Sequence, residues 1–235
     1  MQPAVSVVVP VYRNESTLAE LHQRLRRAMG AHADACEYIY VNDASPDRSF
    51  ARLLALKRSD PAIRIVRLNQ NRGQSLALLR GLEVARGAVI ALLDADLQDP
   101  PESVPSLLAA LAADQKLDVV FGGRRGQYED RLRLLSSWLH KRLLYLLSRR
   151  RLPADAGLFL VMRAAVRDRL LRQPYGDGSY LLSAIAATDA RCISVPVLRQ
   201  SNREGTSGYT PRTRIAVGLR SLRAMLQLRK TRRSV

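Results

Sequence analysis

The sequence of 235 residues contains only two cysteines, Cys36 and Cys192. They lie far apart and each has apolar neighbours, so we expect two buried structural thiols. Two cysteines are too few for a disulfide framework or a cysteine-based zinc site. Histidine is equally scarce: His22, His32 and His140 fall in predicted helices or at their ends, where surface or packing roles are the default.

The sequence also lacks any apolar run of about eighteen residues, the length that a membrane-spanning helix requires. Its first ten residues have no basic segment ahead of their apolar run, which indicates a first strand and not a signal peptide. We therefore expect a cytoplasmic protein without a membrane-spanning helix of its own.

Acidic residues are outnumbered, with 21 Asp and Glu against 38 Lys and Arg, which gives a formal net charge of +17. This charge predicts an anionic partner: nucleic acid, an acidic membrane surface or a phosphate-bearing substrate. Aromatic residues make up only 5%, and no base-stacking platform or recognition-helix motif is present. Nucleic acid is therefore the least favoured of the three partners.

What the sequence does contain is a regular alternation of strands and helices, and its length favours one large domain. The predicted strands are residues 5–11, 37–41, 63–68 and 88–93, and the predicted helices are residues 17–29, 48–57, 75–85 and 101–113. Thr17 and Glu20 have the spacing of a capping box at the first helix. Four successive β-α units predict an α/β fold with a doubly wound, mostly parallel sheet, whose ligands bind at the carboxyl ends of its strands.

Polar residues collect at those strand ends, and acids and amides outnumber lysines there although the chain is basic. They are Tyr12, Arg13, Asn14 and Glu15 after the first strand, Asn42, Asp43 and Ser45 after the second, Asn69, Gln70, Asn71, Arg72 and Gly73 after the third, and Asp94, Asp96 and Gln98 after the fourth.

The fourth strand and its continuation read A-V-I-A-L-L-D-A-D-L-Q-D-P-P-E over residues 88–102. Asp94, Asp96 and Gln98 alternate with apolar residues, so in an extended chain their side chains would emerge on one side. Such oxygen ligands suit a hard divalent cation, Mg²⁺ or Mn²⁺, whose other ligands are phosphate oxygens. The alternative is an ordinary acidic turn stopped by proline.

Beyond a fifth predicted strand at residues 118–122, which ends in G-G-R-R, the alternation stops. Residues 131–148 predict an amphipathic helix with Trp138 and Tyr145, which either packs on the sheet or lies at a membrane interface. A strand is predicted at residues 193–198 and a flexible loop at residues 203–209. The tail at residues 211–235 is basic and contains no acid.

Five motifs in this order carry a resemblance to a known family: V-V-V-P-V-Y-R-N-E, Y-V-N-D-A-S-P-D, N-R-G-Q, L-D-A-D-L-Q-D-P-P-E and R-E-G-T-S-G-Y-T. The chain resembles the family-2 glycosyltransferases with the A-type nucleotide-sugar fold, in particular bacterial polyprenyl-phosphate glycosyltransferases and dolichyl-phosphate mannose synthase. The resemblance implies one Rossmann-like catalytic domain at residues 1–210, with a nucleotide-binding half at 1–123 and an acceptor half at 124–210. Residues 211–235 would form a basic amphipathic tail.

The resemblance also implies roles for individual residues. On the donor side, the nucleoside pocket would be lined by Pro10, Tyr12 and Glu15, the uracil or guanine edge would be read by Asp43, and the donor-side loop would include Arg72 and Gly73. Asp94 would lie near the ribose and diphosphate, and Asp96 with Gln98 would hold the divalent metal, with Asp94 close enough to contribute. On the acceptor side, the lipid phosphate would be gripped by Arg124, Arg125 and Arg131, and the diphosphate would be covered by Arg203, Ser207 and Tyr209.

The implied reaction is an inverting, metal-dependent transfer from a nucleotide sugar, UDP- or GDP-linked, to polyprenyl (undecaprenyl) phosphate at the cytoplasmic membrane face. A phosphate monoester is already an anion at neutral pH, because its second pKa is about 6. Its oxygen can attack the anomeric carbon without a strong base, and a single displacement gives a β-linked lipid sugar from an α-linked donor.

The chain departs from the family pattern D-x-G-[DS]-F-R, because Leu158 and Leu160 occupy its polar and arginine positions. Many relatives also continue into transmembrane helices. In this chain we expect residues 131–148 and the basic tail to contact an anionic membrane surface, at about 1 kcal/mol for each Lys or Arg near it. A separate integral-membrane partner and a homo-oligomer are both compatible with the sequence.

Two alternatives remain open. The acceptor could be a polysaccharide or other hydroxyl, which requires a general base, and Asp155 and Asp177 are the candidates. Alternatively, the two leucines could mark a catalytically weak nucleotide-sugar-binding subunit of a membrane complex.

Overall fold

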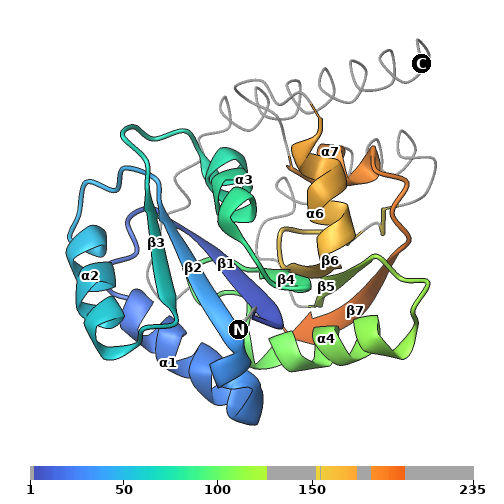
Figure 1. The fold of residues 1–235 in the computed structure, drawn as a ribbon, viewed down its shortest axis with the longest axis horizontal. Coiled ribbons are helices and arrows are strands. Elements are labelled where there is room, and N and C mark those ends of the chain that lie inside the picture. The colour runs from blue at the N-terminus through green and yellow to red at the C-terminus, as the bar shows by residue number, and fades with distance from the viewer. Residues whose placement is uncertain (1–2, 126–151, 154, 174–180, 199–235) are drawn as a thin grey trace.

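A computed structural model describes residues 3–125, 152–153, 155–173 and 181–198 of the chain (Figure 1). For Arg124 and Arg125 it describes the backbone alone. The predicted helix at residues 131–148, the loop at 203–209 and the basic tail at 211–235 lie outside the described residues.

The described residues build a sheet of seven strands in the order β3-β2-β1-β4-β6-β5-β7. The strands are β1 (Val5–Val11), β2 (Cys36–Asn42), β3 (Ile63–Arg67), β4 (Val89–Leu92), β5 (Val119–Arg125), β6 (Leu160–Arg163) and β7 (Cys192–Leu198). The first four are parallel, and β7 is parallel to β5. Only β6 runs antiparallel to its neighbours β4 and β5. The sheet is therefore mostly parallel, as the sequence predicted.

Helices cover both faces of this sheet. Within the described residues they are α1 (Leu18–Met29), α2 (Ser49–Ser59), α3 (Gln74–Val84), α4 (Val104–Ala113), α6 (Ala164–Leu171) and α7 (Leu181–Ala186), with the short 3-10 helices η1 (Gly30–Ala35) and η2 (Pro101–Ser103). Figure 1 shows α3, α6 and α7 over one face and α1, α2 and α4 against the other. The chain thus forms a three-layer α/β domain with two apolar cores.

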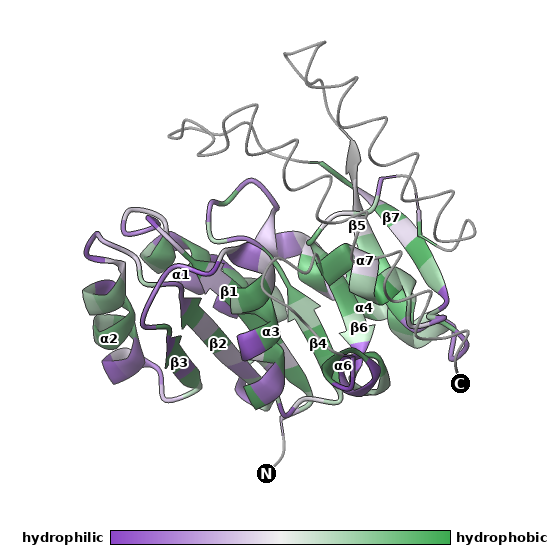
Figure 2. Cartoon of the chain, turned by 90° about the horizontal axis from the view of Figure 1, so that it is seen from above, coloured by the Kyte–Doolittle hydropathy of each residue, from purple (hydrophilic) through white to green (hydrophobic). Residues whose placement is uncertain are grey.

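Side chains of the central strands alternate between these two cores. Val8 packs beneath α3 in one core, while Val7 and Val9 pack against α1 in the other. Because both faces are buried, the central strands are mostly apolar, which Figure 2 shows as the green strand β4 between the helices. Strands β2 and β3 also contain charged residues, Glu37 in β2 and Arg64 and Arg67 in β3. Gly81 lets α3 approach β1 closely, since a Cβ there would lie 2.2 Å from Cγ1 of Val8.

The four predicted β-α units are confirmed, and their ends agree with the prediction to within two residues. The fourth helix opens with the 3-10 turn η2. Neither β6 nor the helices α6 and α7 was predicted, because the segment around Leu160 shows no alternation that distinguishes a short antiparallel strand from a loop.

The predicted capping box at α1 is wrong. Thr17 occupies the N-cap position but makes no side-chain cap hydrogen bond. Its hydroxyl donates instead to the carbonyl oxygen of Ala95 at 2.6 Å, and the carbonyl oxygen of Asn14 lies 3.2 Å away. A tertiary contact has therefore replaced the local cap.

Among the residues that the structure describes, no helix combines the length and apolar character needed to cross a membrane.

Candidate functional site

Four loops meet at one edge of the sheet, where the parallel strands β1 to β4 end. The strand register places Val11 beside Asn42 and Asn42 beside Arg67. The backbone N–H of Leu93 continues the β4 pairing by donating to the carbonyl of Val8. The residues that follow these strands therefore share one edge, as expected for a doubly wound sheet. They include the predicted site residues Tyr12, Glu15, Asp43, Arg72, Gly73, Asp94, Asp96 and Gln98.

Asp43 holds the loop between β3 and α3. Its side chain is buried, at 2% relative exposure. One carboxylate oxygen accepts the backbone N–H of Arg72 at 2.7 Å, and the other accepts that of Gly73 at 2.8 Å. Gly73 has φ +85°, a conformation that favours glycine. The carboxylate that the resemblance assigns to the nucleobase thus also fixes the start of α3.

Asp94 contacts the same helix. The side-chain amide of Gln74, the first residue of α3, donates to Oδ1 of Asp94. Gln74 is the last residue of the N-R-G-Q motif at residues 71–74, but it had been given no role of its own. Residues 72–74 therefore touch both Asp43 and Asp94.

The segment around Asp96 is a turn and not an extended chain. Strand β4 ends at Leu92, and Leu97 has φ +60°. Asp96 Oδ1 accepts the backbone N–H of Gln98 at 3.0 Å, which closes the turn. The expectation that Asp94, Asp96 and Gln98 alternate along an extended strand is therefore wrong, although all three lie in the same short loop.

The loops after β1 and β2 brace one another through hydrogen bonds. Arg13 donates its N–H to the hydroxyl of Ser45 at 2.7 Å, and Glu15 donates its N–H to Asp47 at 3.2 Å. Burial opposes ionisation of Asp47, but hydrogen bonds from Ser45 and Ser49 outweigh it and lower the pKa of this carboxyl. Asp47, to which the sequence assigned no role, is thus a structural member of the site together with Ser45, which was among the polar residues predicted at the strand ends.

The three residues predicted to line a nucleoside pocket differ in exposure. Pro10 is buried within β1. Tyr12 is 42% exposed, and the guanidinium carbon of Arg13 lies 5.5 Å from its ring centroid. Glu15 accepts the backbone N–H of Arg48 at 2.9 Å, so its carboxylate takes part in the loop bracing. Tyr12 is the member whose ring is open to a ligand.

The side chains of Asp94, Asp96 and Gln98 offer oxygen atoms that could bind a divalent cation. Within the part of the chain that the structure describes, no three His, Cys, Asp or Glu side chains form a group able to hold a metal ion. Two carboxylates and an amide are, however, the donor set that Mg²⁺ or Mn²⁺ uses when phosphate and water complete its shell. These residues fit a divalent cation shared with a diphosphate.

Asp155, in the segment before β6, lies beside Gly123 of β5 and Ser194 of β7. Its carboxylate accepts the hydroxyl of Ser194 at 2.8 Å. A Cβ on Gly123 would lie 2.1 Å from Oδ2 of Asp155, so glycine is needed at that position. The carboxylate is therefore held against β5 and β7.

Leu158 and Leu160, the two departures from the family pattern, are part of the core. Leu158 is 6% exposed and Leu160 is fully buried, and both belong to the core beneath α3 and α6. Leu160 pairs with Leu92 and with Phe121 in the sheet. In this chain the arginine position of the family pattern therefore holds a buried core leucine and not a cation.

Several predicted site residues cannot be placed. Asp177 and the side chains of Arg124, Arg125, Arg131, Arg203, Ser207 and Tyr209 lie outside the described residues.

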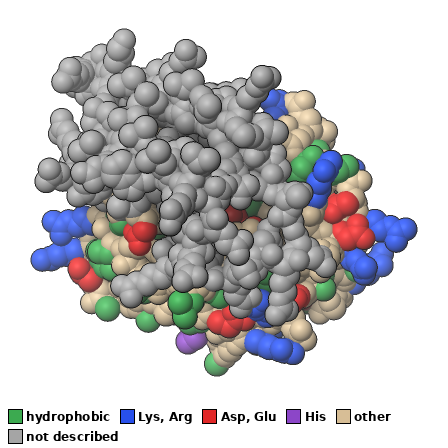
Figure 3. Space-filling view, turned by 180° about the vertical axis from the view of Figure 1, so that it is seen from behind, with side chains coloured by type: hydrophobic (Ala, Val, Ile, Leu, Met, Phe, Trp, Pro, Cys, Tyr) green, Lys and Arg blue, Asp and Glu red, His purple; other side chains and the backbone are tan. Residues whose placement is uncertain are grey.

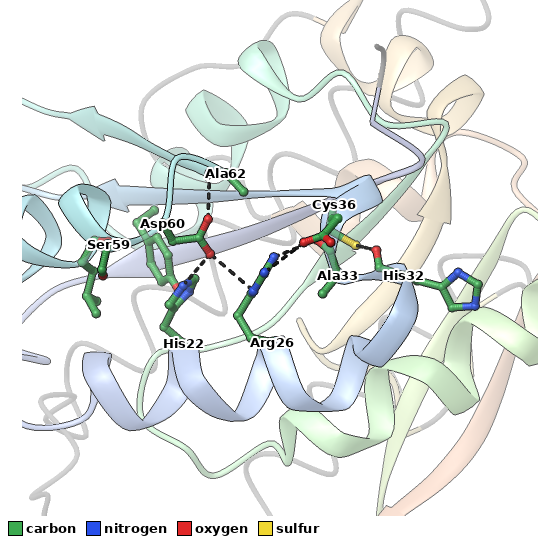
Figure 4. Close-up of polar contacts among 11 residues, drawn as sticks. His22, Arg26, His32, Ala33, Cys36, Ser59, Asp60 and Ala62 are labelled. Atoms are coloured by element: carbon green, nitrogen blue, oxygen red, sulfur yellow. Dashed lines mark hydrogen bonds and ion pairs between the residues drawn. The ribbon is translucent and has the colours of Figure 1, made fainter.

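A second polar cluster lies away from this edge, beside a cavity of about 850 Å³ between α1 and the end of α2. Figure 4 shows His22 and Arg26 pointing from α1 toward Asp60, which precedes β3. His22 lies 3.0 Å from both Asp60 and Tyr40. Because a carboxylate only accepts, Nε2–H of neutral His22 donates to Asp60 and Nδ1 accepts from Tyr40. His22, Asp60 and Tyr40 thus bind one another, which gives the cluster a structural role.

The family described as Glycosyl transferase family 2 matches residues 6–172 of the chain. The chain is 33% identical over 168 residues to the uncharacterized glycosyltransferase YkcC of Bacillus subtilis, covering 71% of this chain and 51% of the relative. It is 37% identical over 213 residues to the undecaprenyl-phosphate 4-deoxy-4-formamido-L-arabinose transferase of Pectobacterium atrosepticum, covering 88% of this chain and 62% of the relative. The chain thus spans between half and two thirds of the length of these two relatives.

Solved structures share the fold. Glucosyl-3-phosphoglycerate synthase from Mycobacterium tuberculosis, in complex with Mn²⁺, UDP and glucosyl-3-phosphoglycerate, superposes with a TM-score of 0.69 at 19% identity, covering 96% of this chain and 80% of that one. The mannosyltransferase PcManGT from Pyrobaculum calidifontis, in complex with GDP-Man and Mn²⁺, superposes with a TM-score of 0.62 at 19% identity, covering 99% of this chain and 65% of that one.

Proposed function

The chain belongs to glycosyltransferase family 2, and from this membership we propose that it moves a sugar from a nucleotide-sugar donor to undecaprenyl phosphate, with inversion and with a divalent cation. The observation that carries the proposal is the convergence of Asp43, Asp94 and Asp96 at the carboxyl edge of β1 to β4. The relative from Pectobacterium atrosepticum supports the acceptor, since its name states undecaprenyl phosphate.

In the proposed donor complex, Pro10, Tyr12 and Glu15 line the nucleoside side and Asp43 accepts from the base edge. Each carboxylate oxygen of Asp43 has a second lone pair, so its bonds to Arg72 and Gly73 leave acceptor capacity for a base N–H. The same contacts hold the donor-side loop in place. Base recognition and loop geometry then depend on one side chain.

Asp94, Asp96 and Gln98 would hold the cation on the donor diphosphate. A cation there supplies positive charge to the departing nucleoside diphosphate. The protein orients these ligands through Gln74 on Asp94 and through the turn that Asp96 forms with the N–H of Gln98. The side chains are thereby arranged before the donor arrives, which lowers the reorganisation needed on binding.

The transfer itself needs little from the protein besides positioning. An oxygen of the lipid phosphate attacks the anomeric carbon, and the bond from that carbon to the donor's diphosphate oxygen breaks, with its electron pair leaving on the nucleotide. The attacking oxygen is already anionic, so no proton has to be removed. Arg124, Arg125 and Arg131 are proposed to bind the acceptor phosphate and Arg203, Ser207 and Tyr209 to cover the diphosphate.

The distribution of charge supports a peripheral position at the cytoplasmic membrane face. Residues 126–151 and 199–235 contain 17 of the 38 Lys and Arg residues but only 3 of the 21 Asp and Glu residues. On the described surface in Figure 3, basic and acidic side chains are interspersed. Most of the +17 net charge is therefore concentrated in two segments that suit an anionic lipid surface.

The test is transfer from a radiolabelled nucleotide sugar in the presence of undecaprenyl phosphate and Mn²⁺ or Mg²⁺. We expect a labelled product that organic solvent extracts, and its loss when either the lipid or the cation is omitted. Asp96→Ala should abolish transfer, while Asp114→Ala, on an exposed turn, should not. Full activity of Asp96→Ala would overturn the metal role. Thermal-shift screening against UDP-, GDP- and dTDP-sugars identifies the donor.

A second candidate keeps the donor chemistry and transfers the sugar to a hydroxyl acceptor. Asp155 supports it, because a carboxylate fixed by Ser194 at the edge of the acceptor half could serve as a general base. Label that passes to a soluble sugar without lipid would favour this candidate. Donor binding without any turnover would instead favour a catalytically weak subunit.

A further inference from the structure

Three consecutive residues connect the two acidic side chains of the donor site. The backbone N–H groups of Arg72 and Gly73 bind Asp43, and the side-chain amide of Gln74 binds Asp94. Asp43 follows β2 and Asp94 follows β4, two strands separated by β1 in the sheet. The start of α3 therefore spans the distance between them.

We infer that Gln74 is a positioning residue that orients the carboxylate of Asp94 toward the donor diphosphate and its cation, which rests on the proposed function above. Glutamine suits this task because its amide donates a hydrogen bond but carries no charge. A lysine or arginine here would neutralise the negative charge that attracts the cation. The amide orients Asp94 and leaves that charge in place.

The backbone that carries Gln74 is held rigidly, as a positioning residue requires. Helix α3 is packed closely on the sheet, with Gly81 against Val8 and with Leu78 and Leu82 buried in the core. At its N-terminus, the two hydrogen bonds to Asp43 fix the residues just before Gln74. The amide therefore projects from a helix that is held at both ends.

The backbone beside Asp94 has a separate support. Thr17 donates its hydroxyl to the carbonyl of Ala95 at 2.6 Å. Removal of the Gln74 amide should therefore weaken the orientation of the Asp94 side chain while the loop backbone stays in place. This separation distinguishes a positioning role from a general structural one.

The experiment compares Gln74→Met, which keeps the length of the side chain and removes the amide, with Gln115→Met in the exposed turn before β5 as the matched control. Mn²⁺ binding is measured by electron paramagnetic resonance in the presence of the nucleoside diphosphate that the wild-type protein binds. Affinity for the corresponding nucleoside is measured without metal. Thermal unfolding of each variant is recorded in parallel.

We expect Gln74→Met to raise the Mn²⁺ concentration at half-saturation by about tenfold, the typical effect of removing a group that orients a metal ligand. Nucleoside affinity should change by less than about twofold, because the contacts of Asp43 are backbone contacts that the substitution keeps. Gln115→Met should change neither value. Gln74→Ala serves as a second variant, since alanine is the residue most favourable to a helix.

Unchanged Mn²⁺ affinity in both Gln74 variants would overturn the inference, and so would an equal loss of Mn²⁺ and nucleoside affinity. Failure of the wild-type protein to bind any nucleoside diphosphate would overturn the proposed function and this inference together. The two failures are thus distinguished by the wild-type measurement.

Discussion

The hydroxyl of Thr17 donates a hydrogen bond of 2.6 Å to the carbonyl of Ala95, the residue between Asp94 and Asp96. Ala95 is almost fully buried, at 3% exposure, and the bond is partly buried. It joins the start of α1 to the loop that carries the proposed cation ligands, across 78 residues of sequence. The position of that loop therefore depends on the first β-α unit.

Thr17→Val should loosen this loop. Valine has nearly the same shape but cannot donate, so the carbonyl of Ala95 loses its partner. We expect a loss of about 1 kcal/mol in the free energy of unfolding, measured by urea denaturation. Binding of the Mn²⁺–nucleoside diphosphate complex should weaken as well. Thr17→Ser keeps the hydroxyl and is the control; a serine variant as impaired as the valine variant would contradict this explanation.

Asp43→Asn should weaken both the loop that begins α3 and the binding of the nucleoside. Asparagine has one acceptor oxygen where the native side chain has two, so either Arg72 or Gly73 loses the acceptor of its N–H. A hydrogen bond to a charged group contributes about 1.5–3 kcal/mol. We therefore expect lower stability and a loss of nucleoside affinity of at least about tenfold. Isothermal titration calorimetry with the nucleoside measures the second effect.

A matched control for Asp43→Asn is Asp34→Asn, since Asp34 is an exposed acid in η1, before the amino end of β2 and not at the carboxyl ends of the strands. It removes the same charge from the same protein. Wild-type nucleoside affinity is expected for this variant. Equal losses in the two variants would show that net charge, and not the contacts of Asp43, governs binding.

The sequence predicted the framework of the site but not its fine geometry. Apolar runs such as residues 5–11 identify strands buried on both faces, and their parallel order brings Asp43 and Asp94 to one edge. The contact of Gln74 with Asp94 could not be predicted, because it depends on how α3 packs against the sheet. Thr17 was assigned to a local cap for the same reason: its partner Ala95 is distant in sequence.

The segment around Leu160 shows a second reason why the sequence alone did not predict part of the structure. The family pattern places an arginine at position 160, where this chain has a leucine. In the structure Leu160 lies in β6, a four-residue strand that inserts antiparallel between β4 and β5. A strand this short carries too few residues for a periodic pattern, so the sequence could not reveal that this side chain enters the core.

Stability should fall below about pH 6.5, the ordinary pKa of histidine, through His22. Burial lowers the pKa of His22, while the neighbouring Asp60 partly opposes this shift. The folded state then binds fewer protons than the unfolded state, so this contribution is present above the unfolded pKa and is lost as pH falls toward the folded pKa. Protonation would also place a hydrogen on Nδ1, which faces the hydroxyl of Tyr40.

Urea unfolding at pH 5.5 and pH 7.5 checks this dependence. The wild-type protein should be less stable at pH 5.5, and His22→Gln should lose much of that difference because glutamine does not titrate. His32→Gln removes an exposed histidine and should retain the wild-type difference. An identical pH difference in wild-type and His22→Gln would show that other groups cause it.

Leu160→Arg restores the residue of the family pattern, and we expect it to destabilise the protein instead of improving acceptor binding. Leu160 is fully buried between Leu92 and Phe121, so the guanidinium would lie in an apolar core without a partner. An unpaired buried charge costs about 3 kcal/mol or more, which urea denaturation detects readily. Leu198→Arg, at an 80% exposed position of β7, should change the free energy of unfolding by less than about 0.5 kcal/mol. Wild-type stability with faster lipid transfer in Leu160→Arg would mean that this position reaches the acceptor site after all.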